Sequence, residues 1–194
     1  MAAHSPPDAA QASALESQLR EMYGRAAYTH KTHQKMADNY VDRYKRIKFL
    51  EIALSAATAS SLLLAIFGDK PAGTIVGAVL PTILLGLTLY FKEATLGEQA
   101  QKHTEVGAKL WGVREALLSL LADMQDGSPH DDVRRQRDKI NAELESIYKA
   151  APGTSATAYA AAQKALKDSE ELFFSDEELN KVLPKQLRKA GRQA

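Results

Sequence analysis

Apolar side chains gather in two long runs near the middle of the chain. The first run, 49–67, reads FLEIALSAATASSLLLAIF and contains one charged residue, Glu51. The second run, 71–91, has no charged residue in its 21 positions. As an α-helix, a run of that length covers about 31 Å, close to the thickness of the hydrocarbon core of a bilayer. The pattern therefore predicts two membrane-spanning helices.

A very short connection separates the two runs. It consists of Gly68, Asp69 and Lys70, and Pro71 follows it. Glycine is favoured just after the end of a helix and proline in the first turn of the next one, so this stretch predicts a tight turn between antiparallel helices. The soluble alternative makes both runs the buried centre of a helical bundle. That bundle would need a ring of amphipathic partner helices, and the flanks offer few residues to build one.

Apolar positions on both flanks of the runs recur at alternating steps of three and four, which places each set on one face of a helix. The stripe before the first run is Leu15, Leu19, Met22, Ala26, Thr29, His33, Met36, Tyr40, Tyr44 and Ile47. The stripe after the second run is Val106, Leu110, Val113, Leu117, Leu120 and Met124. In an antiparallel hairpin the two stripes face each other. We therefore expect a stalk, resembling a coiled coil, that continues the spans.

The last third of the chain predicts shorter helices separated by turns. Gly127 and Pro129 break the second stripe, and a new helix with one apolar face follows, with Val133, Ile140, Leu144 and Ile147 on that face. Another helix begins after Pro152 and Gly153, where Thr154 or Ser155 can cap it. Ser175 with Glu178 has the spacing of a capping box, which predicts a last short helix.

These patterns define the expected fold class, an all-α membrane protein. It consists of a two-span transmembrane helical hairpin, a long cytoplasmic helical stalk and additional C-terminal helices. Residues 1–12 are expected to form a disordered lead, 13–125 the hairpin with its spans at 49–67 and 71–91 and its stalk, and 131–194 a helical C-terminal region.

Basic residues predict how the hairpin is oriented. Lys35, Arg43, Lys45, Arg46 and Lys48 precede the first span, and Lys92, Lys102 and Lys109 follow the second. The turn offers only Lys70. Lysine and arginine near span ends remain on the cytoplasmic side, so we expect both termini in the cytoplasm. The chain has no cysteine, which agrees with a reducing compartment.

Sequence signals of chemistry are few. The sequence contains no glycine-rich phosphate loop, nucleophile elbow or cysteine cluster, so we expect no enzyme and no cofactor. His30 and His33 lie one helical turn apart, but two histidines are too few to hold a metal, and Lys31 and Lys35 would repel a cation. A structural or solvated role is the first interpretation of these histidines. The alternative is that His30, Lys31 and His33 contact an anion or a nucleotide. Direct DNA binding is not expected.

Glu51 gives the first span one ionisable side chain, and it shares a helical face with Ser55, Thr58 and Leu62 at steps of four, three and four. One interpretation is an interfacial carboxylate that pairs with Lys48 or Lys45 in headgroup water. The other places Glu51, Ser55 and Thr58 on the lining of a pore, with Leu62 as an apolar constriction.

Small residues and one proline mark the second span. Gly73 and Gly77 form a small-xxx-small pair, which favours close approach of helices either within one monomer or between copies. Pro81 removes one backbone hydrogen bond, so the span should bend there, as a hinge or as a fixed kink.

The apolar stripe before the first span is longer than the stripe after the second span can cover. The apolar surface left over predicts a homo-oligomer.

Longer pieces of the sequence carry a resemblance to a family. The helix YTHKTHQKMADNYVDRYKRIKFLEIALSAATA enters the spans, KHTEVGAKLWGVREALLSLL leaves them, and INAELESIYKAAPGTSATAYAAAQKAL completes the layout. Over about residues 15–168 this arrangement resembles the SLATT family of prokaryotic membrane proteins. The resemblance implies an effector of a conflict system that assembles in the bacterial inner membrane and breaches it. It also implies a trigger, either a nucleotide second messenger or a soluble activating protein.

Three classes of function remain at this point. The first is an oligomeric inner-membrane effector of an anti-phage defence system, whose pore or lesion depolarises the membrane and kills or arrests the infected cell. The alternative is a membrane-anchored scaffold that recruits a soluble partner through its stalk, without a pore. The third is a soluble bundle or small regulator.

Overall fold

The computed structural model describes residues 7–67 and 71–189, without the side chains of 7–11, 64, 65, 67, 71–74 and 93. Every regular element in these two ranges is a helix, which confirms the all-α class. The elements are α1 (Pro7–Phe67), α2 (Pro71–Ala94), α3 (Leu96–Gln125), α4 (His130–Ala150), α5 (Ala156–Lys167), α6 (Asp176–Val182) and the short 3₁₀ helix η1 (Lys185–Leu187).

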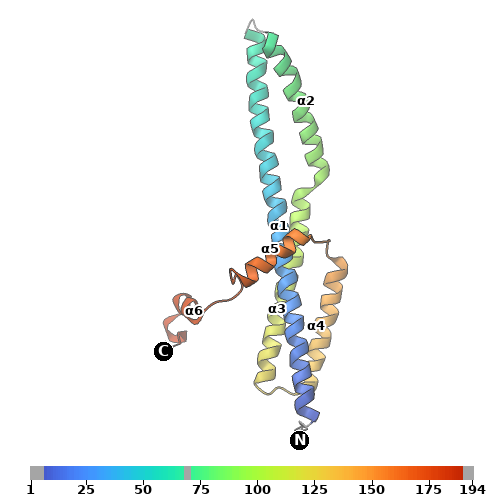
Figure 1. Cartoon of the computed structure of the whole chain (residues 1–194), viewed down its shortest axis with the longest axis vertical. Coiled ribbons are helices and arrows are strands. Elements are labelled where there is room, and N and C mark those ends of the chain that lie inside the picture. The colour runs from blue at the N-terminus through green and yellow to red at the C-terminus, as the bar shows by residue number, and fades with distance from the viewer. Residues whose placement is uncertain (1–6, 68–70, 190–194) are drawn as a thin grey trace.

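One unbroken helix organises the molecule. The 61 residues of α1 correspond to a length of about 90 Å. Figure 1 shows α1 running from the N-terminal end of the stalk to the tip of a projecting arm, with α2 beside its upper part and α3 beside its lower part. The predicted hairpin arrangement of helices is therefore present, and α1 begins at the same end of the stalk at which α3 finishes. The turn residues 68–70 lie outside the described residues.

The core of the stalk is formed by α1, α3 and α4. Its largest fully buried apolar side chains include Leu19, Met22, Leu110 and Leu117. Both predicted stripes contribute to this core, and the predicted face of α4 is buried at all four positions, Val133, Ile140, Leu144 and Ile147. Thr29 and Tyr40 of the first stripe are half-buried, and Tyr44 is exposed. The periodicity thus predicted the packing correctly along most of the stalk.

Predicted helix caps are present in the C-terminal region. Ser155 caps α5 by accepting a hydrogen bond from the backbone N–H of Ala158, so Ser155 rather than Thr154 has this role. Ser175 and Glu178 form the predicted capping box at the start of α6. Each cap satisfies backbone N–H groups that have no partner inside the helix.

Two boundaries differ from the sequence-based expectation. The helix α1 begins at Pro7, a residue suited to the first turn of a helix, within the stretch 1–12 that was expected as a disordered lead. Residues 1–6 lie outside the described residues. The second difference is a break between α2 and α3 at Thr95, whose φ of 42° lies in the left-handed region. A β-branched residue rarely adopts that conformation, so the joint stores backbone strain.

α5 crosses α1 near the middle of the stalk. The rings of Tyr28 and Tyr159 have centroids 6.1 Å apart, and Ser155 Oγ lies 3.4 Å from Met36 Sδ. Past α5, Glu171 pairs with Lys31 and Lys35. The C-terminal module formed by α6 and η1 then projects to the side and contributes no buried residue (Figure 1).

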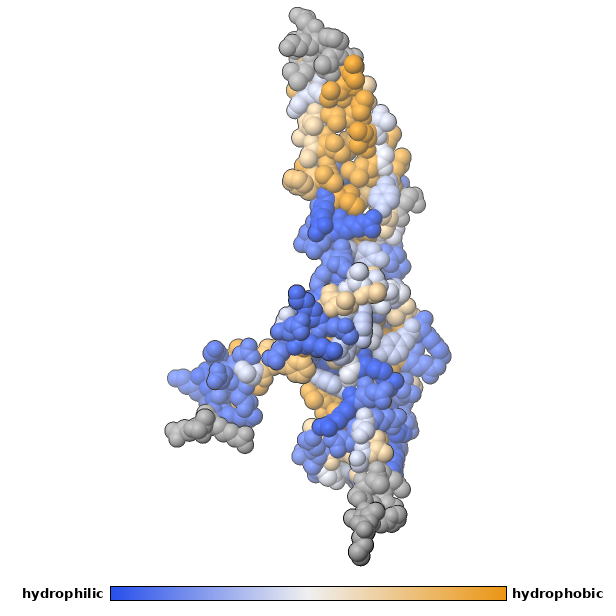
Figure 2. All heavy atoms as spheres, in the orientation of Figure 1, coloured by the Kyte–Doolittle hydropathy of each residue, from blue (hydrophilic) through white to orange (hydrophobic). Residues whose placement is uncertain are grey.

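The arm formed by the end of α1 and by α2 is apolar on its outside. Figure 2 shows a continuous hydrophobic surface over the arm and a largely hydrophilic one over the stalk. Within the described residues, one helical stretch has the length and hydropathy of a membrane span. This stretch, Ile75–Gln125, begins in α2, and its apolar window has a mean hydropathy of 1.8 with only 6% of the window buried. The first predicted span, 49–67, contains side chains that the structure does not describe, so this span stays a prediction.

Candidate functional site

The apolar surface of the arm has no protein cover among the described residues. Large side chains on both arm helices are far more exposed than a water-soluble surface tolerates, as Phe49 (71%), Ile66 (71%), Ile75 (66%) and Leu85 (60%) show. Soluble proteins rarely expose a contiguous apolar patch beyond a few hundred Å². The soluble-bundle interpretation required a ring of partner helices around these segments, and the described helices pack around the stalk instead.

Glu51 lies at the base of the arm and is bound to its own helix. Its carboxylate pairs with Lys48 Nζ at 2.8 Å, and the Glu51 side chain is only 12% exposed. Ser55 donates a hydrogen bond to the backbone carbonyl of Glu51 at 2.7 Å. The pairing of Glu51 with Lys48 is the first of the two interpretations open at the sequence level.

Thr58 and Leu62 continue this face toward the tip of the arm. The hydroxyl of Thr58 is buried, and it has no hydrogen-bond partner among the described residues. Leu62 is 46% exposed. Of the four predicted pore-lining residues, Glu51 and Thr58 are therefore half-buried, whereas Ser55 and Leu62 are exposed.

Gly77 lies where the two arm helices approach each other closely. A Cβ added at Gly77 would lie 3.8 Å from Leu62 Cδ2 and 3.9 Å from the Ser61 carbonyl oxygen. Gly77 is thus used for packing within one chain. Gly73 lies in the first turn of α2, where side-chain contacts are not described. Pro81 lies inside α2, which continues on both sides of it and bows away from α1 (Figure 1).

Aromatic and basic side chains meet at the base of the arm. Arg43 donates a hydrogen bond to the hydroxyl of Tyr90 at 2.6 Å. Lys48 Nζ lies 4.7 Å from the centre of the Phe91 ring. The ring of Tyr44 also packs against Phe91, with 5.1 Å between the ring centroids. Aromatic and basic residues concentrate in this way at the interface between membrane and water.

The predicted trio of His30, Lys31 and His33 does not converge on one point. His30 Nδ1 lies 2.8 Å from the carbonyl oxygen of Gly107 on α3. Lys31 turns toward α5, where it pairs with Glu171. His33 points into the α1–α3 contact. Each side chain thus has a different partner, and the histidines have the structural setting that was the first interpretation.

His33 forms a buried pair with His103, a residue that the sequence analysis did not single out. Their Nδ1 atoms lie 2.8 Å apart, and Tyr40 stacks on His103 with a centroid distance of 5.6 Å. One imidazole must donate the proton of this bond and the other accept it. Burial, followed by the charges of His103 and His30, lowers the pKa of His33 from 6.5 to about 4. Burial also lowers the pKa of His103 and that of His30.

A signal for His103 was present in the sequence. His103 lies three residues before Val106 and extends the second stripe backward by one step. Counted from Asp69 in the turn, His33 lies 36 positions before and His103 lies 34 positions after. An antiparallel hairpin brings residues at similar distances from the turn to similar heights, so this count places the two histidines at about the same level of the stalk.

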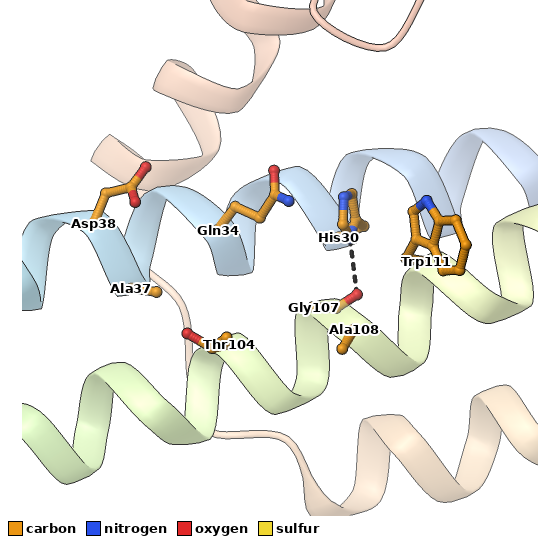
Figure 3. A pocket seen from close by; sticks show the side chains of 8 residues that line it. All are labelled: His30, Gln34, Ala37, Asp38, Thr104, Gly107, Ala108 and Trp111. Carbon is orange, nitrogen blue, oxygen red and sulfur yellow. Dashed lines mark hydrogen bonds between the residues drawn. The ribbon is translucent and has the colours of Figure 1, made fainter.

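An open groove runs between α1 and α3 on the stalk (Figure 3). It has a volume of about 600 Å³ and is lined by His30, Gln34, Ala37, Asp38, Thr104, Gly107, Ala108 and Trp111. Its floor consists of small residues, and Trp111 stands at one end with half of its surface exposed. Asp38 is the only charged residue in the lining, because the lowered pKa of His30 keeps that imidazole neutral at pH 7.

These features define an all-α protein that carries an apolar two-helix arm on a helical stalk. The chain belongs to the SLATT family, since the model of SMODS and SLOG-associating 2TM effector domain family 4 matches residues 15–178. The resemblance inferred from the sequence is thereby confirmed, and membership implies an effector role in a conflict system. No curated protein and no solved structure matches the chain.

Proposed function

We propose that the chain is an oligomeric membrane effector of a prokaryotic anti-phage defence system, which inserts its arm as two antiparallel spans and breaches the inner membrane. The resulting loss of membrane potential kills or arrests the infected cell. The effector acts without catalysis. The family supplies the effector role, and the exposed apolar arm is the observation that carries the mode of action.

The arm supports membrane insertion through its energetics. Transfer of apolar surface out of water contributes about 25 cal/mol per Å², and most of the described large apolar side chains of the arm are exposed. A hydrocarbon environment removes that surface from water without requiring another protein. In this arrangement the tyrosine, phenylalanine and basic side chains at the base of the arm lie at headgroup level. Figure 1 shows the stalk and both ends of the described chain on the same side of the arm, so the proposal puts them together on one side of the membrane.

The polar edge of α1 supports the formation of a breach. A carboxylate such as Glu51 is costly when it faces lipid, so it faces protein or water. The buried hydroxyl of Thr58 has no partner among the described residues, which costs about 1–3 kcal/mol. A rotation of α1 that brings Glu51, Ser55 and Thr58 toward water inside an assembly recovers that cost. The closed contact between α1 and α2 is therefore not the best arrangement for these polar groups.

The test uses planar bilayers with the purified full-length chain. A ring of Glu51 carboxylates at the cytoplasmic mouth attracts cations, so wild-type conductance should favour cations over anions. Glu51→Gln should weaken this preference while assembly is retained, and Glu51→Lys should reverse it or abolish toxicity. Glu98→Gln on the exposed start of α3 is the matched control and should leave selectivity unchanged. If the wild type and both Glu51 variants show the same ion selectivity, Glu51 does not line the pore.

One observation favours the alternative, a membrane-anchored scaffold without a pore. Val182 at the end of α6 is 79% exposed, and Phe174, just before the C-terminal module, is 69% exposed. Such side chains suit recruitment of a soluble protein. The scaffold predicts a membrane-inserted chain that leaves the membrane potential intact.

A further inference from the structure

Basic side chains are concentrated where the stalk meets the arm. The segment 43–48 of α1 reads RYKRIK, so four of its six positions are basic, and Lys92 lies in the last turn of α2. The hydrogen bond from Arg43 to Tyr90 of α2 puts the two segments at one level of the molecule. Figure 2 shows strongly hydrophilic side chains immediately below the apolar surface of the arm.

Most of these cations have no acidic partner. Lys48 pairs with Glu51, whereas Arg43 bonds to the neutral hydroxyl of Tyr90, which does not compensate its charge. The remaining cations are exposed and form no ion pair with a side chain that the structure describes. We name the four cations without an acidic partner the basic collar: Arg43, Lys45, Arg46 and Lys92.

Acidic side chains offset only part of the charge of the basic collar. Beside the pair just described, the acidic residues at this level are Asp42 and Glu93. Four collar cations against two carboxylates leave a net charge of +2. A cluster of roughly four to eight Lys and Arg residues next to the cytoplasmic end of a span is typical of segments that bind anionic lipids. The basic collar, together with Lys48, has this composition.

The apolar surface that adjoins the basic collar restricts the kind of ligand that fits. Phe49 (71%), Leu50 (50%) and Leu89 (56%) are exposed within one helical turn of collar residues. A ligand that contacts both surfaces carries an anionic group directly beside an apolar chain. A phospholipid has this combination, whereas a nucleic acid or an acidic protein surface provides the anionic group without the chain.

We propose that the basic collar binds the headgroup phosphates of anionic phospholipids in preference to zwitterionic ones, with the acyl chains against the apolar arm. The inference rests on the proposed function, because it requires the arm to be inserted in a bilayer. Arg43 uses Nη2 for the bond to Tyr90, and an arginine fork suits phosphate oxygens at its other donors. Binding of this kind holds the basic collar at headgroup level and so fixes how deeply the arm inserts.

The test measures which lipids remain bound to the purified full-length chain. The chain in mild detergent is mixed with equal amounts of phosphatidylglycerol and phosphatidylcholine that have identical acyl chains, and the retained lipids are counted by native mass spectrometry. The wild type should retain several-fold more phosphatidylglycerol than phosphatidylcholine. This excess should fall with rising salt, because salt screens exposed charges.

Two triple variants remove the same charge from different places. The collar variant combines Arg43→Gln, Arg46→Gln and Lys92→Gln, and the control variant combines Lys139→Gln, Lys164→Gln and Lys185→Gln at exposed positions away from the arm. The collar variant should lower the phosphatidylglycerol excess by at least about fivefold, and the control variant should keep it. A collar variant with the wild-type excess, or a control variant with an equal loss, would overturn the inference.

Two further arms make the test sharper. Asp42→Asn removes a carboxylate beside the basic collar and should raise the phosphatidylglycerol excess, so a lowered excess would count against the inference even if the collar variant fails to fold. Inorganic phosphate is compared with chloride at equal ionic strength. Equal effects support a lipid headgroup as the ligand, whereas loss of the excess in phosphate alone would assign the basic collar to a free anion and overturn the inference.

The membrane potential separates this inference from the proposed function. If wild-type chains depolarise cells but retain both lipids equally, the basic collar has no lipid preference and the effector function stands. If the wild type selects phosphatidylglycerol through the basic collar but leaves the membrane potential intact, the lipid site stands and the proposed breach fails.

Discussion

Acidification should destabilise the stalk through the buried pair of His33 and His103. In the unfolded chain His33 takes up a proton near pH 6.5, whereas in the folded chain burial delays this to about pH 4. Between these values the unfolded state binds more protons, so stability falls as the pH falls, and it is fully retained above about pH 6.5. For His33 alone, the loss between pH 7.5 and pH 5 is about 2 kcal/mol. His103 adds to the loss in the same direction, because its pKa is also lowered.

The fluorescence of Trp111 can report this change, since it is the single tryptophan of the chain and lies on the stalk. For a chain of this size, 2 kcal/mol lowers the melting temperature by about 4–8 °C. Thermal melts of the intact protein in detergent should show a drop of that order from pH 7.5 to pH 5. His33→Gln keeps a hydrogen-bonding side chain but does not titrate, so its drop should be smaller, while His130→Gln on α4 should behave as wild type. An equal drop in His33→Gln and wild type would refute the reasoning.

Three further variants test the packing of the stalk and its joints. Leu117→Ala removes a fully buried side chain and should cost about 2–5 kcal/mol of unfolding free energy, whereas Leu187→Ala on the exposed η1 should change it by less than about 0.5 kcal/mol; equal melting temperatures would contradict the core assignment. Thr95→Gly relieves the positive φ at the joint between α2 and α3 and should stabilise the protein by about 1 kcal/mol, while Thr29→Gly inside α1 should destabilise it by about 0.3 kcal/mol from helix propensity; a loss of stability in Thr95→Gly would show that the joint is not strained. Glu171→Ala removes the carboxylate that Lys31 and Lys35 contact, so the backbone amides of α5 should exchange hydrogen faster than in wild type. Glu177→Ala is the control and should exchange as wild type does. Unchanged exchange in Glu171→Ala would show that these ion pairs do not hold α5 against α1.

The sequence predicted the parts of the fold that depend on local periodicity. Leu19 and Leu117 belong to stripes that bury one face of a helix, and such stripes can be identified without knowledge of the partner. The caps at Ser155 and Ser175 are local for the same reason, because each side chain bonds to a backbone group three residues away.

Features that depend on contact between distant segments were harder to predict. Thr95 has no residue-type signal for a helix break, since the left-handed region is rare for threonine, and only the geometry of the joined helices imposes it. His103 required the register between two helices, which the turn position provides, whereas the ion pairs of Lys31 with Glu171 required knowledge of where α5 crosses α1. The groove is a property of the packing of α1 against α3, and no short stretch of the sequence indicates it.

The membrane potential of cells that express the chain tests the central claim most directly. Induced wild-type chain should depolarise the cells, as a voltage-sensitive dye reports. Leu63→Asp places a charge on the apolar outside of the arm, which is costly inside a span, and it should abolish the effect, whereas Leu187→Asp on the C-terminal module should not. A normal membrane potential in cells whose carbonate-washed membranes retain the wild-type chain would contradict the account and leave a membrane anchor without a breach.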